Sequence, residues 1–321
     1  MGRGRVSTTT FSLRERRPRA GRDYVSRVPD EPMPLLPPPA RDLLHLLDEA
    51  GRAAMAHFSP SVHVTRKADG SPVTAADVAA ERVLLAGIRA LYPEDRALSE
   101  EGGAIGSASS LAEGEGCWVI DPLDGTSAFT EGLAHWGPTL ARLERRGEGL
   151  VVTTGATWLP RLGEYWWVGA HAGRQVAVHA DAPGAVRVLS PLATPPRAVV
   201  YVPSELHATA RLRWRGKARC LGGTAAHLAL VARGSAGAVV VGPGWSSWDV
   251  AAGLGLIVGT GGAVWLIGAD QPLESAGTEE GARAVLPPSG APFVAGHPDV
   301  VAEVAAVLVP ERFTAGEVDA T

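Results

Sequence analysis

Residues 118–126 read Trp-Val-Ile-Asp-Pro-Leu-Asp-Gly-Thr, and the rest of the chain is organised around this stretch. An apolar run over residues 117–120 leads directly into two aspartates, a proline, a glycine and a threonine. The run is typical of a short buried strand, which puts Asp121 at a carboxyl end, where open α/β sheets hold their ligands. Pro122 and Gly125 predict a tight turn immediately after this strand.

Such a turn can direct the carboxylates of Asp121 and Asp124 toward one point. Two like charges at that distance repel each other, and burial strengthens the repulsion. A cation between them relieves it, and hard oxygen ligands favour Mg²⁺. Thr126 adds a hydroxyl at the same place, and residues 125–129 can begin a helix whose N–H groups receive a phosphate. The alternative interpretation is an Asp-rich turn that only caps a helix.

The composition is that of an ordinary globular protein. The 321 residues are 45% hydrophobic and 20% charged, with a formal net charge of −4, so nucleic acid is not expected as the main partner. Cys117 and Cys220 could pair, but their apolar neighbours favour free thiols and a cytoplasmic location. Residues 250–269 are uncharged, yet their six glycines predict a buried helix, a turn and a strand rather than a membrane span.

Residues 1–40 are expected to form a disordered basic and Pro-rich extension. Eight arginines fall between positions 3 and 27, and six prolines follow between positions 29 and 39. The apolar core of a secretory signal is missing from this segment. The segment could be a transit peptide, translation could begin at Met33, or the basic tail could contact nucleic acid.

A Pro- and Ala-rich stretch at residues 182–196 predicts a domain boundary. We expect an N-terminal α+β metal-binding domain over residues 41–185, a C-terminal α/β domain over residues 186–310, and a tail over residues 311–321. The predicted fold class is therefore α/β, with strands and helices alternating in the second half.

The expected elements follow from periodicity and from turn residues. Core-facing helices begin at Arg41 and at Thr74, and Tyr92-Pro93 ends the second of them. The strands expected next cover residues 136–143, 150–158, 164–170 and 175–179. The helices expected in the second half cover residues 204–212, 223–233, 248–258 and 298–307.

For three further carboxylates, the sequence is compatible with either a metal-ligand role or a structural role. Asp77 follows Thr74 by three residues, which is close to a capping box. Glu100 precedes a second acid and two glycines, so it belongs to a solvated turn or supplies an oxygen ligand to the cation at Asp121. Asp249 begins a helix, so it caps that helix or completes the metal site from the second domain.

Taken together, these residues resemble the inositol monophosphatase family, a superfamily of Mg²⁺-dependent, lithium-sensitive phosphatases. The resemblance covers about residues 41–308, and its specificity comes from four blocks in one order at family-like spacing. A weaker fifth block is Gly223-Thr224-Ala225-Ala226. The four blocks are Lys67 to Asp77, Glu100-Glu101, Asp121-Pro122-Leu123-Asp124-Gly125-Thr126, and Trp248-Asp249 followed by Ala251-Ala252-Gly253.

The resemblance implies a layered α-β-α-β-α fold with two or three Mg²⁺ ions in a cleft between two halves. It implies that Glu100, Asp121 and the Leu123 carbonyl bind one ion. It gives a second ion to Asp121, Asp124 and Asp249. A weaker third ion would bind Glu100 together with waters.

The same resemblance implies roles around the substrate. Asp77 and Thr126 would orient and deprotonate the attacking water, beside the metal ligand Glu100. Divalent ions would neutralise the phosphoryl oxygens, lower the pKa of water and stabilise the leaving oxygen of a small phosphate monoester. The implied substrate contacts are Asp124, Gly125, Thr126, Ser127, Gly223, Thr224, Ala225 and Asp249.

Departures from the family pattern leave the substrate open. Inositol-selective members usually carry an acid where this chain has Gly242, and their usual Thr-Asn-Phe is Ser-Ala-Phe at residues 127–129 here. Residues 136–139 resemble relatives that act on histidinol phosphate, whereas the segment after Gly222 does not follow that subgroup. An inositol monophosphate-like ester, histidinol phosphate and adenosine 3′,5′-bisphosphate are all candidates.

Two readings outside catalysis are also open. A catalytically inactive descendant would bind a phosphorylated metabolite, although such a protein would not need the full ligand set. A nucleic-acid-associated protein would use its basic tail. A homodimer is suggested by the resemblance alone.

Overall fold

A computed structural model describes residues 36–59, 64–66, 72–102, 111–181, 185–190, 192, 199–278 and 281–310. The expected disordered extension and the C-terminal tail fall outside these residues, apart from residues 36–40 of the extension. The first part of the Lys67 block and most of the expected domain boundary at 182–196 fall outside them as well. The division into domains at residue 185 therefore stays a prediction.

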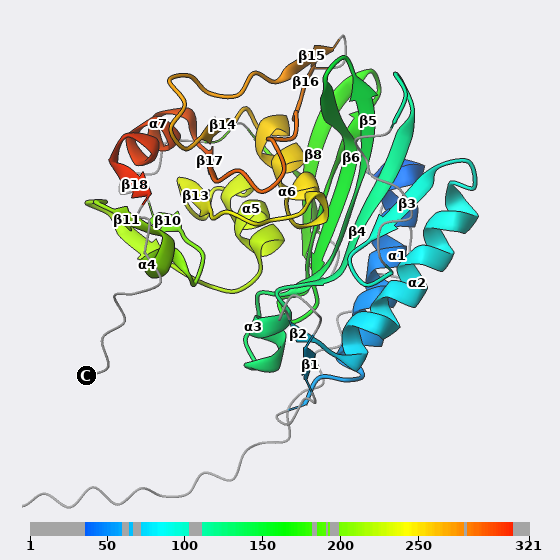
Figure 1. Ribbon diagram of the computed structural model, residues 1–321. Helices are drawn as coiled ribbons and strands as arrows, with labels where there is room; N and C mark the ends of the chain where they lie inside the picture. Colours follow the sequence, from blue (N-terminus) through cyan, green and yellow to red (C-terminus); the bar gives the residue numbers. More distant parts are fainter. Residues whose placement is uncertain are drawn as a thin grey trace, which may run out of the picture.

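The elements form five alternating layers, as Figure 1 shows. Helices α1 (Pro38–Met55) and α2 (Ala75–Leu91) cover one face of a seven-stranded sheet. Helices α5 (Thr224–Ala232) and α6 (Ser247–Gly259) pack on its other face and separate it from a five-stranded sheet. Helix α7 (Pro298–Val307) covers the far side of that second sheet. This arrangement confirms the predicted α-β-α-β-α fold.

The larger sheet follows chain order from edge to edge. Its first two strands are parallel, and all the following neighbours are antiparallel. The strands predicted between residues 136 and 179 are all present. In order, the strands are β3 (Arg96–Ser99), β4 (Gly116–Asp124), β5 (Gly137–Arg146), β6 (Gly149–Leu159), β7 (Glu164–His171), β8 (Arg174–Asp181) and β9 (Ala185–Val188).

The smaller sheet is mixed, and three short strand pairs and two short helices complete the described chain. Its strands are, in spatial order, β12 (Lys217–Arg219), β10 (Val199–Tyr201), β13 (Ala238–Val241), β17 (Phe293–Gly296) and β14 (Ala263–Leu266). The short pairs are β1 (Thr65–Arg66) with β2 (Pro72–Val73), β11 (Ala210–Leu212) with β18 (Leu308–Pro310), and β15 (Ala276–Thr278) with β16 (Gly281–Arg283). The short helices are α3 (Thr126–Thr130) and α4 (Leu206–Thr209).

Strand β4 is buried along its whole length because helices cover both of its faces. Successive side chains of a strand point to opposite sides. Trp118 and Ile120 therefore join the core under α1 and α2, whereas Cys117 and Val119 join the core around α5 and α6. This explains why the decisive stretch begins with an unbroken apolar run.

Two local predictions are wrong. The helix expected over residues 204–212 forms only at Leu206–Thr209, because residues 210–212 pair as β11 with β18 near the end of the chain. The tight turn expected from Pro122 is a continuation of β4 with a β-bulge between Asp121 and Asp124. The chain turns instead at Gly125, whose φ of 84° lies in the left-handed region.

Other local predictions are confirmed. Residues 250–269 form most of α6, a turn at Gly261 with φ of 75°, and strand β14. Within the described residues, no helix combines the length and apolarity needed to cross a bilayer. Both cysteines are free thiols, Cys117 buried and Cys220 exposed.

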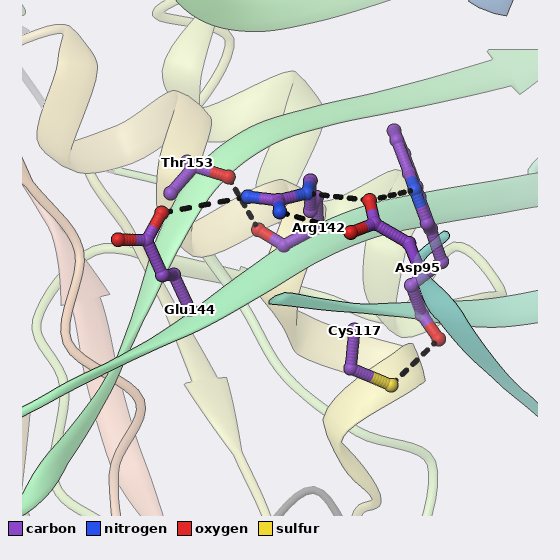
Figure 2. Close-up of polar contacts among 6 residues, drawn as sticks. Asp95, Cys117, Arg142, Glu144 and Thr153 are labelled. Atoms are coloured by element: carbon purple, nitrogen blue, oxygen red, sulfur yellow. Dashed lines mark hydrogen bonds and ion pairs between the residues drawn. The ribbon is translucent and has the colours of Figure 1, made fainter. Parts of the chain in front are cut away.

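An ion pair at one end of the large sheet fixes its edge strand. Arg142 on β5 donates from Nε and Nη2 to the two carboxylate oxygens of Asp95, at 2.7 and 3.0 Å (Figure 2). The indole N–H of Trp118 donates to the same carboxylate at 3.1 Å. A Cβ at Gly116 would lie 2.0 Å from Arg142, so a glycine is needed beneath the guanidinium. Asp95 directly precedes β3, and the pair therefore holds this strand beside β4.

A second ion pair joins the large sheet to the helix layer behind it. Glu164 at the start of β7 pairs with Arg233 at the end of α5, and His179 lies 3.3 Å from the same carboxylate oxygen. Burial acts against the charge, but hydrogen bonds from His179 and Arg233 prevail and lower the pKa of Glu164 to about 2.

Glu164→Gln should destabilise the protein in a pH-dependent way. Because folding lowers the pKa of Glu164, its ion pair stabilises the fold above the ordinary glutamate pKa, and this contribution is lost as the pH falls toward 2. We expect a loss of about 1–2 kcal/mol of unfolding free energy at pH 7, allowing for partial solvent screening. Urea denaturation between pH 7 and pH 3 should show the difference from wild type shrinking. Exposed Glu148→Gln is the control, and a pH-independent difference would contradict the assignment.

Candidate active site

The parallel pairing of β3 and β4 brings Glu100 beside Asp121. Ser99 is in register with Ile120, and the N–H of Glu100 donates to the Ile120 carbonyl at 3.1 Å. The next residues along the two strands are therefore Glu100 and Asp121, at the same level of the sheet. The carboxylate of Asp121 is 2% exposed and accepts the N–H of Leu123 at 2.8 Å.

Four carboxylates act on one another at this place. Burial, followed by the charges of Glu100, Asp124 and Asp249, raises the pKa of Asp121 well above its usual range. Burial and the charge of Asp249 raise the pKa of Asp124 to about 8, although three backbone N–H groups oppose the shift. The structure therefore brings together the four acids that the sequence proposed as ligands.

An oxygen-only donor set with this repulsion suits a hard divalent cation, because the cation supplies the missing opposite charge. Within the described part of the chain, no three His, Cys, Asp or Glu side chains already surround a common point closely enough to hold an ion. The fit to Mg²⁺ rests on the chemistry and the mutual repulsion of the four acids.

Asp124 also connects the two halves of the molecule. Its carboxylate accepts the N–H groups of Thr224, Ala225 and Ala226 at 2.9, 2.9 and 3.4 Å. These are the first N–H groups of α5, whose N-cap residue Gly223 has no side chain to satisfy them. Asp124 thus acts as the N-cap of a helix that begins 100 residues later.

Two glycines make this approach possible. A Cβ on Gly223 would lie 2.0 Å from Oδ2 of Asp124. A Cβ on Gly125 would lie 2.9 Å from the Gly223 Cα atom, and its φ of 84° also favours glycine. The N–H of Gly223 donates to the His135 carbonyl at 2.8 Å. The halves therefore meet backbone to backbone at the base of the site.

Asp77 caps a helix and also contacts Thr126, its predicted catalytic partner. Its Oδ2 accepts the N–H and the hydroxyl of Thr74, at 2.7 and 2.6 Å, which completes the capping box of α2. Its Oδ1 lies 3.0 Å from the hydroxyl of Thr126, which is 3.2 Å from the Leu123 carbonyl. Burial raises the pKa of Asp77, and its hydrogen bonds act against this shift.

Asp249 likewise belongs to a capping box. Its Oδ2 accepts the N–H of Ser246 at 2.7 Å, at the start of α6. The cap turns the carboxylate toward the end of β4, where its charge acts on both Asp121 and Asp124.

A cleft of about 290 Å³ opens beside these acids. Of the predicted substrate contacts, Ala225 and Asp249 are not among its lining residues. Ala225 instead directs its N–H to Asp124. The predicted residues that line the cleft are Glu100, Asp124, Gly125, Thr126, Ser127, Gly223 and Thr224.

Sequence reasoning missed Glu81, which holds the turn that carries Glu100. Its Oε1 accepts the hydroxyl of Ser99 and, at 2.7 Å, the N–H of Gly102. Glu81 follows Asp77 by four residues on α2, so both acids lie on one face of the helix. That spacing was the signal that could have identified it.

Comparisons with known proteins identify the family of the chain. The chain is an α/β protein of five alternating layers, with a cluster of carboxylates at the end of the buried strand β4. The sequence model of the inositol monophosphatase family matches residues 42–299, and the chain belongs to this family.

Relatives carry several names. A protein of Streptomyces griseus, named glucose-1-phosphate thymidylyltransferase, is 36% identical over 148 residues, which are 46% of this chain and 54% of that protein. A histidinol-phosphatase of Streptomyces coelicolor is 34% identical over 42% of this chain and 50% of its own length. The chain thus spans about half the length of these two relatives. An inositol-1-monophosphatase of Caulobacter vibrioides is 31% identical over 64% of this chain and 80% of its own length.

Solved structures show the same fold. An IMPase of Thermotoga maritima superposes with a TM-score of 0.58, covering 83% of this chain and 94% of that one at 22% identity.

Gly223→Ala should destabilise the protein, because the added methyl group would displace the carboxylate of Asp124 from α5. We expect a loss of about 1–3 kcal/mol in urea unfolding with a chelator present. The matched control is Gly242→Ala, where the nearest heavy atom is 3.6 Å away, and it should change stability by less than about 0.5 kcal/mol. Equal losses in the two variants would show that the close approach to Asp124 is unimportant.

Proposed function

We propose that the chain is a Mg²⁺-dependent phosphatase that hydrolyses a small phosphate monoester with water as the nucleophile. The main support is the cluster of four mutually repelling carboxylates, of which Glu100 and Asp124 line the cleft, as does Thr126, the hydrogen-bond partner of Asp77. The relatives named histidinol-phosphatase and inositol-1-monophosphatase act on such esters by name.

The proposed ligands are Glu100, Asp121 and the Leu123 carbonyl for one ion, and Asp121, Asp124 and Asp249 for a second. Glu100 would also serve a weaker third ion. When bound, Mg²⁺ supplies positive charge at the phosphoryl oxygens and lowers the pKa of water. The N–H bond from Leu123 to Asp121 and those from α5 to Asp124 hold both carboxylates in fixed orientations.

Thr126 and Asp77 are proposed to handle the proton of the attacking water. When the Thr126 hydroxyl donates to Oδ1 of Asp77, its oxygen lone pairs can accept a proton from a water in the cleft. The proton lost by the water can then pass through Oγ1 of Thr126 to Oδ1 of Asp77. The raised pKa of Asp77 makes its carboxylate a better base for this transfer.

The phosphate group is proposed to bind at the start of α3. Gly125 and Thr126 begin this helix and line the cleft, and their N–H groups would hold a phosphate oxygen. Ser127, Gly223, Thr224 and Ala225 complete the proposed binding set, together with Asp124 and Asp249. A protein that only binds phosphorylated metabolites would show ester binding without turnover.

We also propose that the protein works in the cytoplasm, which its two free thiols suit, and that it forms a homodimer, as the family resemblance implies.

Asp121→Asn should lower Mg²⁺-dependent turnover of phosphate monoesters at least about 100-fold. The same change removes one of four repelling charges, so stability in the presence of a chelator should stay equal or rise. Steady-state kinetics on a panel of phosphate esters, with urea unfolding beside it, tests both effects. Exposed Asp299→Asn is the control. Near wild-type turnover in Asp121→Asn would refute the metal assignment.

Thr126→Val should reduce kcat by about 10²–10⁴ with little change in KM, because it removes the proton path to Asp77. Thr126→Ser keeps the hydroxyl and should stay within about tenfold of wild type. Initial-rate measurements on both variants decide the matter. Similar rates for the valine and serine variants would remove Thr126 from the mechanism.

A further inference from the structure

His227 is a buried polar residue that the proposed mechanism does not use. It lies in the first half of α5 with 3% of its surface exposed, and its ring stacks on Tyr201 of β10 at 5.2 Å between centroids. Its Nε2 accepts the N–H of Leu221 at 2.9 Å. Because Nε2 is an acceptor, the proton of the neutral ring is on Nδ1.

His227 lines a cavity, and its Nδ1–H has no acceptor among the described residues. Among the residues that the structure describes, Leu221 is the one hydrogen-bond partner of this side chain. His227 lines a pocket of about 90 Å³, several times the roughly 10–15 Å³ that one water needs. Burial, with a small contribution from His135, lowers the pKa of His227 to about 4, so the ring stays neutral at physiological pH.

This side pocket is a continuation of the cleft. The two cavities share Ser204, Gly222 and Thr224 as lining residues. The phosphate is proposed to bind at the cleft end, near α3, so the part of a substrate that carries no phosphate can extend into the pocket. The pocket also contains Glu205, whose carboxylate accepts the Ser204 hydroxyl at 2.7 Å.

We propose that His227 is a specificity-determining residue, whose Nδ1–H donates a hydrogen bond to a hydroxyl oxygen in the non-phosphate part of the substrate. This inference rests on the proposed phosphatase function and narrows it to esters of hydroxyl-bearing alcohols. A hydroxyl group suits the pocket because it accepts from the imidazole and donates to the carboxylate of Glu205. An alkyl group would offer the Nδ1–H of His227 no acceptor.

Two substitutions separate this donor from the other role of the ring. His227→Gln can place its Oε1 near the position of Nε2, so it keeps the acceptor for Leu221 and loses the donor. His227→Asn can place its amide N–H near Nδ1, so it keeps the donor and loses the acceptor. The exposed thiol of Cys220, next to Leu221, reports whether this wall of the cleft stays ordered, since Cys117 is buried.

The test compares glycerol 2-phosphate, which carries hydroxyl groups, with ethyl phosphate, which carries none. Wild type should prefer glycerol 2-phosphate in kcat/KM, and His227→Gln should reduce this preference about fivefold to tenfold. His227→Asn should keep most of the preference but speed up the alkylation of Cys220, which His227→Gln should leave unchanged. An equal preference in wild type and His227→Gln, or no preference in wild type, overturns the proposal.

Failure of the proposed function looks different from failure of this inference. If wild type turns over neither ester with Mg²⁺, the phosphatase proposal fails. The same preference is then measured as a ratio of dissociation constants by calorimetry, which requires no catalysis. A ratio that His227→Gln does not lower rejects the role of His227 in either case.

Discussion

The carboxylate of Asp124 accepts three N–H groups at the start of α5, and this contact joins the halves of the molecule. It places the end of β4 from the first half directly against a helix start from the second. The approach requires Gly125 and Gly223, whose backbones would not tolerate side chains there. The cleft depends on this junction, because residues from both of its sides line it.

Each aspartate of the site is anchored by a backbone N–H. Asp77 accepts from Thr74, Asp121 from Leu123 and Asp249 from Ser246, while Asp124 accepts from α5. Such bonds favour the ionised form and oppose the desolvation that burial imposes. The structural interpretation of these residues as caps and the functional interpretation as ligands therefore do not compete. The same bond that begins a helix also sets the direction of a carboxylate.

The sequence predicted the features that depend on local spacing. Helix α2, its capping box and its end at Tyr92 follow from periodicity and turn chemistry, and so do the strands from β5 to β8. Contacts between distant segments could not be predicted from the sequence. The pairing of β11 with β18 replaced part of a predicted helix, and the contact of Glu81 with Gly102 joins residues 21 apart in the chain. For the site, the four acids proposed as ligands act on one another in the structure, but the cap from Asp124 to α5 was not foreseen.

The junction of Gly125 and Gly223 also limits how such an architecture can diversify. With two backbones in contact and a carboxylate wedged between them, the floor of the cleft has no free volume in which a new side chain could appear. Variation is left to other lining residues of the cleft, such as Glu131, Leu133 and Ser204. New substrate preferences in related chains would then arise from substitutions among these other lining residues, while the residues at the floor of the cleft stay the same. Substrate selectivity could therefore evolve without changes to the catalytic residues.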